Sequence, residues 1–174
     1  MRAVPTPVLA AEEVAAIVET MAEAITPRID DDTVAVCLLT GGLWFAADLT
    51  RALGRRGRHP LFDALWLASY HDERASTGTV LVRAGLQRSV QDRRVLVMDD
   101  VFDSGLSLRE SARIVTEAGA AEVLSAVFAR KPWPTPRLIE PDFVGWEAPP
   151  RYLVGYGMDS AARYRGLGDI CALD

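Results

Sequence analysis

Two patterns of hydrophobic and polar positions alternate along this chain. Apolar residues recur every three or four positions, as in amphipathic helices, at residues 12–26, 43–53 and 107–118. Short, mostly apolar runs predict buried strands at residues 34–39, 61–68, 79–82, 95–98 and 123–128. The third helix is expected to end at Gly119 and to turn one face inward, made of Leu108, Ala112, Val115 and Ala118. Strands that alternate with helices favour an α/β fold with a mainly parallel, right-handed sheet.

The segment 131–150 breaks both patterns. It contains six prolines, which are too many for a regular helix. We therefore expect loops and short strands in this part of the chain, ending with a short apolar strand at residues 152–154.

Length and charge narrow the classes of function. A chain of 174 residues fits one domain with a sizeable core, and 49% hydrophobic with 25% charged residues is an ordinary composition. A formal net charge of −5 argues against general binding to nucleic acids. An anionic substrate would therefore have to be held by local cations, a metal or backbone N–H groups.

The two cysteines and the first residues suggest a location. Cys37 lies inside an apolar run and Cys171 is far away in sequence, so we predict no disulfide framework and no CxxC metal site. Residues 1–11 are too short, and are followed too soon by Glu12 and Glu13, for a signal peptide or membrane span. We expect a cytoplasmic protein that binds no membrane.

The most informative segment runs from Val95 to Leu108. An apolar strand is followed by three acids, Asp99, Asp100 and Asp103, and then by a loop of serine and glycine that opens a helix. Carboxylates at a strand end suit ribose hydroxyls or a metal ion. A helix start offers free N–H groups and the positive end of the helix dipole, which suit a phosphate. The segment therefore predicts a phosphoribosyl-binding enzyme.

Simpler explanations exist for each candidate residue. The acids after residue 98 could serve only as helix caps, with Asp103 as the N-cap. The Gly41-Gly42 pair could be a plain strand-to-helix turn, and Lys131 a solvated surface residue. Tyr152 could be a core aromatic. The remaining simple assignments are a turn acid for Asp159, a surface arginine for Arg165, and non-ligands for His59 and His71, which lack metal-ligand spacing.

The segment 95–108 resembles the phosphoribosyl-pyrophosphate (PRPP) binding motif of type I phosphoribosyltransferases. Further segments, at 39–49, 69–70, 131–132, 141–145 and 154–159, are similar to the hypoxanthine-guanine phosphoribosyltransferases and follow the order of that family. The resemblance implies one domain over 1–174, with a parallel core at about 30–130. It also implies a small hood lobe made from about 1–12 and 131–174.

The resemblance assigns the PRPP side of the site. It places Asp99 and Asp100 at the ribose hydroxyls with Mg²⁺ close by, and Asp103 as a general base near N7 of the purine. The implied 5′-phosphate cradle consists of Ser104, Gly105, Leu106 and Ser107. The implied pyrophosphate contacts are Thr40, Gly41 and Arg165, with a cis peptide between Leu39 and Thr40. Many members carry lysine where this chain has Thr40, which removes a positive charge.

The resemblance also assigns the purine side. Lys131 would donate to the 6-oxo oxygen, which adenine lacks, and Tyr152 would stack on the base. Leu153 would offer backbone groups to the base edge. Asp159 would lie near the 2-position and a second Mg²⁺, while Ser69 and Tyr70 would begin a mobile loop that closes over the site.

The implied reaction joins hypoxanthine or guanine to the ribose of PRPP, giving IMP or GMP and pyrophosphate. Two alternatives remain open. One is a xanthine-preferring transferase, and the other is a regulatory protein that kept the fold and binds RNA or nucleotides. We expect Mg²⁺ as cofactor, PRPP and a 6-oxopurine as partners, no nucleic acid, and a homodimer or homotetramer.

Overall fold

The computed structural model describes residues 4–69 and 80–173. Three α-helices, one 3-10 helix and nine strands follow one another within these ranges. In chain order they are β1 (Thr6–Leu9), α1 (Ala11–Ile25), η1 (Thr26–Arg28), β2 (Val34–Leu39), α2 (Leu43–Arg55), β3 (Leu61–Ser69), β4 (Val80–Ala84), β5 (Arg94–Phe102), α3 (Leu106–Glu117), β6 (Glu122–Arg130), β7 (Phe143–Glu147), β8 (Leu153–Val154) and β9 (Ile170–Ala172).

A six-stranded sheet forms the centre, in the order β4-β3-β2-β5-β6-β7. All neighbouring pairs are parallel except β3 with β4 at one edge. In the central register Cys37 lies between Ala64 of β3 and Met98 of β5. The predicted α/β fold with a mainly parallel sheet is confirmed. The carboxyl ends of β2, β5 and β6 therefore meet at one edge of the sheet, where the chemistry is expected.

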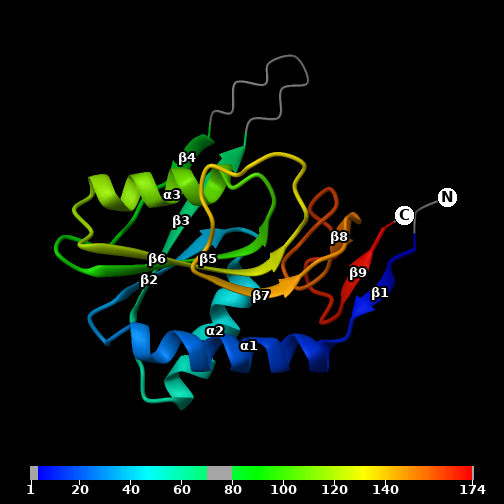
Figure 1. Cartoon of the computed structure of the whole chain (residues 1–174), viewed down its shortest axis with the longest axis horizontal. Helices are drawn as coiled ribbons and strands as arrows, with labels where there is room; N and C mark the ends of the chain where they lie inside the picture. The colour runs from blue at the N-terminus through cyan, green and yellow to red at the C-terminus, as the bar shows by residue number, and fades with distance from the viewer. Residues whose placement is uncertain (1–3, 70–79, 174) are drawn as a thin grey trace.

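Helices cover both faces of this sheet, with α1 and α2 on one side and α3 on the other (Figure 1). Successive strand residues point to opposite faces. Ala35 and Cys37 thus pack into the cluster that includes α1 and α2, while Val34 and Val36 pack into the cluster that includes α3. Because the strands are buried on both faces, their sequences read as continuous apolar runs rather than as alternating ones.

A second, three-stranded antiparallel sheet, which we call the hood, has the order β1-β9-β8. Figure 1 shows it beside the carboxyl end of β7. The Ala11 N–H donates to Asp169 Oδ1 at 2.8 Å and so joins the start of α1 to the hood. The expected hood range of 131–174 was too wide. Residues 143–147 form β7, which pairs in parallel with β6 and extends the main sheet.

Several predicted ends shift for reasons of pairing and packing. The strand expected at 95–98 runs to Phe102, because its pairing with β6 continues as far as Arg130. Asp99 and Asp100 therefore lie within the strand rather than after it. The helix expected to stop at residue 53 continues to Arg55.

The third helix starts one residue earlier than predicted, at Leu106. Its inward face buries Ser111 with Leu108 and Val115, whereas Ala118, expected to be inside, is exposed at the C-cap. In the described part of the chain, no helix combines the length and apolar character needed to cross a membrane.

Candidate active site

Two carboxylates lie side by side at the end of β5. Asp100 is 8% exposed, Asp99 is half-buried, and the Asp100 N–H donates to Asp99 Oδ1 at 3.0 Å. Burial raises the pKa of both carboxyls, and the charge of Asp100 raises the pKa of Asp99 further. The charged forms of the pair are therefore disfavoured in the free protein, and a bound cation or a hydroxyl donor would stabilise them.

The loop after β2 lies directly against this pair. It begins with a cis peptide between Leu39 and Thr40, as the resemblance implied. A Cβ at Gly41 would lie 2.1 Å from Asp100 Oδ2, so residue 41 must be glycine for the backbone to come this close. A Cβ at Gly42 would lie 2.7 Å from the Leu38 carbonyl oxygen. The two glycines are thus required by close approach as well as by the turn.

The start of α3 forms the next part of the edge. Gly105 has φ of 85°, and a Cβ there would be 3.1 Å from the Phe102 ring and 3.2 Å from Ile139. The Leu106 N–H donates to Ser104 Oγ at 3.4 Å. Gly105 is the N-cap of the helix, with no side-chain cap, so the alternative that Asp103 serves as N-cap is wrong. The first-turn N–H groups of α3 have no side-chain cap, and a helix start of this kind favours a bound anion.

Lys131 follows β6 and lies close to Asp103. Its Nζ is 4.0 Å from Asp103 Oδ1, and its backbone N–H donates to the Phe102 carbonyl at 3.0 Å. The Lys131 side chain is only 22% exposed, so Lys131 is not the solvated surface residue of the simpler explanation. The structure brings the candidate general base and the candidate purine lysine together.

The hood contributes an exposed aromatic ring. Tyr152 is 54% exposed, and its hydroxyl donates to the Asp159 carbonyl at 3.0 Å, so the core-aromatic alternative is wrong. The Leu173 N–H donates to the Tyr152 carbonyl, and Leu153 pairs with Ala172. In an antiparallel ladder the next pair along directs its N–H and C=O groups outward. The backbone groups of Leu153 therefore point away from β9, although its side chain is buried.

Arg165 connects the hood to the acids. Its Nη2 lies 2.8 Å from Asp159 Oδ1, and its Nη1 donates to the Gly157 carbonyl. The positive charge of Arg165 opposes the rise in the Asp100 pKa that burial causes. A Cβ at Gly157 would lie 2.0 Å from the Gly41 carbonyl oxygen, so the turn before Asp159 packs on the loop at residues 40–42. The PRPP side and the purine side of the expected site are therefore in contact.

Asp159 makes two contacts of its own in this conformation. Asp159 Oδ1 pairs with Arg165 and Oδ2 accepts from the Ala162 N–H at 2.6 Å. In the ranges 4–69 and 80–173, no group of three or more His, Cys, Asp or Glu side chains is arranged to hold a metal. Asp159 is thus not joined with Asp99 and Asp100 in a common cluster. Ser69 and Tyr70 were predicted to begin a mobile loop. Ser69 is the last residue of β3, and Tyr70 lies outside the described residues.

Sequence reasoning missed Arg137, whose guanidinium reaches the backbone of both Asp103 and Lys131. The available signal was weak. An arginine followed by Leu138 and Ile139 interrupts a run of prolines and small residues.

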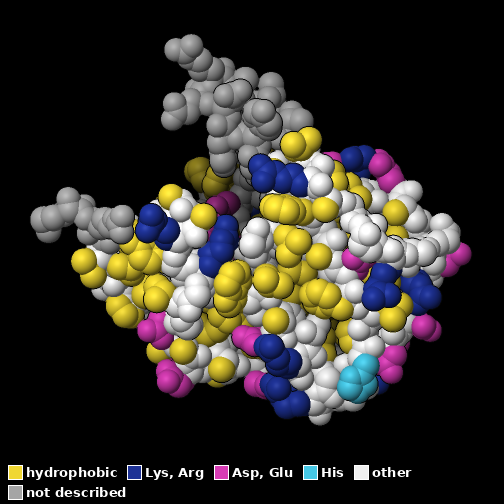
Figure 2. Space-filling model, turned by 180° about the vertical axis from the view of Figure 1, so that it is seen from behind, with side chains coloured by type: hydrophobic (Ala, Val, Ile, Leu, Met, Phe, Trp, Pro, Cys, Tyr) yellow, Lys and Arg dark blue, Asp and Glu magenta, His cyan; other side chains and the backbone are white. Residues whose placement is uncertain are grey.

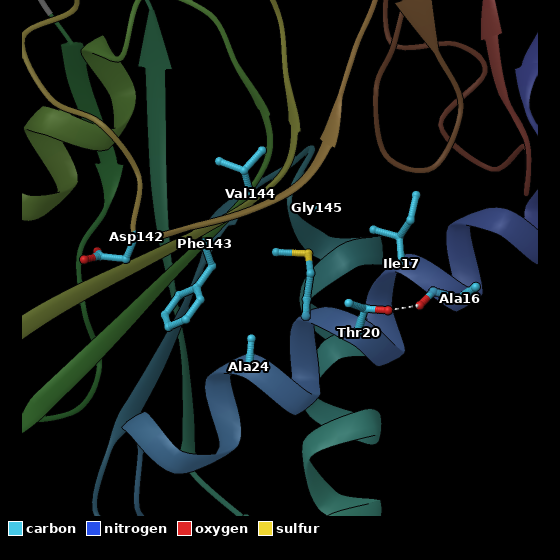
Figure 3. A pocket seen from close by; sticks show the side chains of 9 residues that line it. Ala16, Ile17, Thr20, Ala24, Asp142, Phe143, Val144 and Gly145 are labelled. Carbon is cyan, nitrogen blue, oxygen red and sulfur yellow. Dashed lines mark hydrogen bonds between the residues drawn. The ribbon is translucent and has the colours of Figure 1, made fainter.

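A separate apolar cavity of about 410 Å³ lies between α1 and β7 (Figure 3). Its walls are formed by Ala16, Ile17, Thr20, Met21, Ala24, Asp142, Phe143, Val144 and Gly145. A Cβ at Gly145 would lie 2.6 Å from Met21 Sδ, so glycine allows α1 to approach the strand closely. Every candidate site residue lies outside this lining, and the cavity is distinct from the edge described above.

Known proteins are similar to this chain in sequence and in fold. A sequence model of the phosphoribosyl transferase domain matches residues 7–161. The hypoxanthine-guanine phosphoribosyltransferase of Mycobacterium tuberculosis is 31% identical over 173 residues, which cover 95% of this chain and 84% of that protein. The protein of the same name from Bacillus subtilis is 32% identical over 157 residues, which cover 90% of this chain and 86% of that protein.

Solved structures give the same result. A hypoxanthine phosphoribosyltransferase from Staphylococcus aureus matches with a TM-score of 0.86 at 27% identity, covering 97% of this chain and 90% of that one. With the acid motif, the glycine loop and the hood arranged as described, these matches show that the chain belongs to the phosphoribosyltransferase family, within its hypoxanthine-guanine branch.

Proposed function

We propose that this protein is a purine salvage enzyme that transfers the 5-phosphoribosyl group of PRPP to hypoxanthine or guanine. The products are IMP or GMP and pyrophosphate. One observation carries the proposal: Lys131 Nζ lies 4.0 Å from Asp103 Oδ1 at the strand edge that also holds Asp99 and Asp100. A donor for a 6-oxo group thus lies beside a motif suited to a ribose phosphate.

Asp99 and Asp100 hold the ribose in this proposal. Carboxylate oxygens accept hydrogen bonds from the 2′ and 3′ hydroxyls. The backbone N–H groups and hydroxyls at Ser104, Gly105, Leu106 and Ser107 receive the 5′-phosphate. This arrangement orients the anomeric carbon toward the purine and so lowers the entropic part of the barrier.

The paired acids also fit Mg²⁺, which takes oxygen ligands and is commonly held by one or two carboxylates together with substrate phosphates. Their burial supports this assignment: it raises the pKa of both carboxyls by disfavouring the charged forms, and a bound cation would offset that cost. When bound, Mg²⁺ supplies positive charge that stabilises the leaving pyrophosphate. Asp159 would join a second Mg²⁺ only after exchanging its contact with Arg165.

The purine would lie between Tyr152 and the strand edge. The exposed Tyr152 ring provides a stacking surface, and the outward backbone groups of Leu153 meet the base edge. Lys131 donates to the 6-oxo oxygen. Asp103 accepts the N7 proton, or stabilises positive charge on the base, as the new C–N bond forms.

Thr40, Gly41 and Arg165 are the proposed pyrophosphate contacts. Arginine's planar fork suits phosphate oxygens, and Arg165 already lies near Asp100. Thr40 offers a hydroxyl and a backbone N–H where many relatives offer an ammonium. We therefore expect pyrophosphate binding to rely more on Arg165 and Mg²⁺ in this protein. Closure of the loop that starts at Ser69 and Tyr70 would exclude water from the reacting ribose.

The proposal includes a homodimer or homotetramer in the cytoplasm. Figure 2 shows hydrophobic side chains gathered across the middle of the face that lies behind the sheet in Figure 1. Phe62 and Trp66 on β3 and Leu81 on β4 are among the exposed large hydrophobic residues. A second copy of the chain would bury such a surface. Two free cysteines, Cys37 and Cys171, are consistent with a reducing compartment.

Turnover with PRPP, Mg²⁺ and each base in turn tests the function. We expect IMP from hypoxanthine and GMP from guanine, and no product from adenine, because Lys131 can only donate. Product from xanthine alone would favour the xanthine-preferring alternative. No product from any base would reject a catalytic function and leave the regulatory protein.

A further inference from the structure

The loop between β6 and β7 is exposed except at a few side chains. Residues 132–136 are exposed, as is Leu138, while Arg137 and Ile139 are turned inward. The Arg137 side chain is only 12% exposed. Long cationic side chains are rarely enclosed to this extent unless their donors are used. The contacts of Arg137 show how its donors are used.

The Arg137 guanidinium forms contacts to two separate segments of backbone. Its Nε donates to the Asp103 carbonyl at 2.7 Å, and its Nη2 donates to the Lys131 carbonyl. Nη1 lies 3.4 Å from Glu140 Oε1. The guanidinium carbon also lies 4.8 Å from the centroid of the Phe102 ring, within the range of a cation–π contact.

The residues that Arg137 holds are the two whose side chains meet across the site. Asp103 follows β5 and Lys131 follows β6, so their spacing depends on two loop starts outside the regular ladder. The planar fork of an arginine suits this place, because it donates to both carbonyls while it stacks on Phe102. Ile139 reinforces the contact, since it packs beside Phe102 and Gly105.

We propose that Arg137 is a positioning residue that sets the distance between the Lys131 ammonium and the Asp103 carboxylate. This inference rests on the proposed function, in which those two groups contact the same purine. Arg137 acts through their backbone carbonyls and does not touch the substrate itself. Without it, both carbonyls lose a charged donor, and the two loop starts are linked only through the Lys131 N–H bond to the Phe102 carbonyl and the ion pair itself.

The kinetic test compares Arg137→Met with the parent protein. Methionine keeps apolar contact with Phe102 but removes every donor. We expect the KM for hypoxanthine to rise at least 5-fold and kcat to fall, with the KM for PRPP changed less than 2-fold. The phosphate loop is continuous with α3 and does not depend on Arg137 alone. Unchanged KM values with a lower kcat would indicate only a smaller folded fraction, and would overturn the proposal.

Two further variants keep this test decisive. Arg137→Lys preserves the charge but lacks the planar fork that carries donors on separate nitrogens, so we expect an effect between those of Arg137→Met and the parent. Wild-type kinetics in Arg137→Lys would overturn the proposal, even if Arg137→Met fails to fold. Arg94→Met is the matched control. Arg94 also lies on β5, but at the opposite end of the strand, where it pairs with Glu122. The Arg94→Met variant should leave the KM values for hypoxanthine and for PRPP unchanged.

A chemical readout separates this inference from the proposed function. Lys131 is the only lysine in the sequence, so an amine acylating reagent modifies this side chain and otherwise only a terminal amine. We expect Lys131 to be acylated several-fold faster in Arg137→Met than in the parent or in Arg94→Met, as measured by mass spectrometry. An equal rate would overturn the positioning role. If the parent turns over no base, the proposed function fails, and the acylation rates still decide whether Arg137 holds Lys131.

Discussion

Gly157 of the hood packs so closely on Gly41 that a Cβ at residue 157 would lie 2.0 Å from the Gly41 carbonyl oxygen. Gly157 also has φ of 97°, which disfavours any other residue. We expect Gly157→Ala to lower the free energy of unfolding by about 1–3 kcal/mol, the usual cost of such a backbone position. The KM for PRPP should rise at least 10-fold, because the Gly41 loop is displaced from Asp100.

Thermal unfolding and steady-state kinetics measure these two effects. Gly85→Ala is the matched control, since a Cβ there meets nothing within 4 Å. A Gly157→Ala protein with the parent's KM for PRPP would show that the contact between hood and loop has no part in binding.

Asp103→Asn tests the general base. The amide cannot accept the N7 proton, so we expect kcat to fall by about 10²–10⁴-fold, the usual contribution of such a group. The KM for PRPP should stay within 3-fold, because Asp99, Asp100 and the start of α3 are intact. Turnover at the parent's rate would remove Asp103 from the chemistry. Asp92→Asn, in the exposed turn before β5, serves as the control.

Lys131→Met tests the recognition of the 6-oxo group. A hydrogen bond from a charged donor contributes about 1.5–3 kcal/mol, so we expect kcat/KM for hypoxanthine to fall by about 10- to 100-fold. In the parent protein, bound IMP should protect Lys131 from acylation. Rapid acylation of Lys131 in the presence of saturating IMP would place this side chain outside the purine pocket.

Removal of Mg²⁺ should affect turnover and leave the fold intact. Among the described residues, every buried side-chain nitrogen or oxygen has a hydrogen-bond partner, so the folded state does not require an ion to satisfy one. We expect EDTA to abolish product formation and to leave Tm unchanged in the absence of substrate. A large drop in Tm on chelation would indicate a structural metal instead.

The contact between α1 and α2 should depend on pH. Glu19 pairs with Arg55 and Arg56, and hydrogen bonds from these arginines lower its pKa in the folded state. A lowered carboxyl pKa stabilises the fold above the unfolded pKa, and this stabilisation is lost as pH falls through the folded pKa. We therefore expect Glu19→Gln to lower Tm at pH 7 and to have a smaller effect near pH 3.

Glu23→Gln is the control for this experiment, because Glu23 lies on the exposed face of the same helix. An equal loss of Tm for Glu19→Gln at both pH values would mean that packing, rather than charge, accounts for the effect.

The sequence identified the acids and the strand-helix order because both depend on local pattern. Val95–Met98 is apolar enough to predict a buried strand, and the resemblance assigned Asp103 and Lys131 to one site. The local pattern could not place the end of β5, since Asp99 and Asp100 belong to the sheet only through their pairing with β6.

Other features depend on contacts between distant segments. The role of Arg137 was invisible because its partners at residues 103 and 131 are brought together only by the folded sheet. Residues 143–147 looked like part of an irregular lobe, and only their pairing with β6 shows that they belong to the main sheet. Ala118 fits the helical spacing but falls at the C-cap, where the helix no longer faces the sheet.

The hood also joins the two ends of the sequence. Strand β1 has β9, at the far end of the sequence, as its only described strand partner, whereas the acid motif lies in β5, which pairs with β2 and β6 inside the main sheet. The hood sheet can therefore form only once β9 has been synthesised, so the last residues of the sequence complete the site that the acid motif begins.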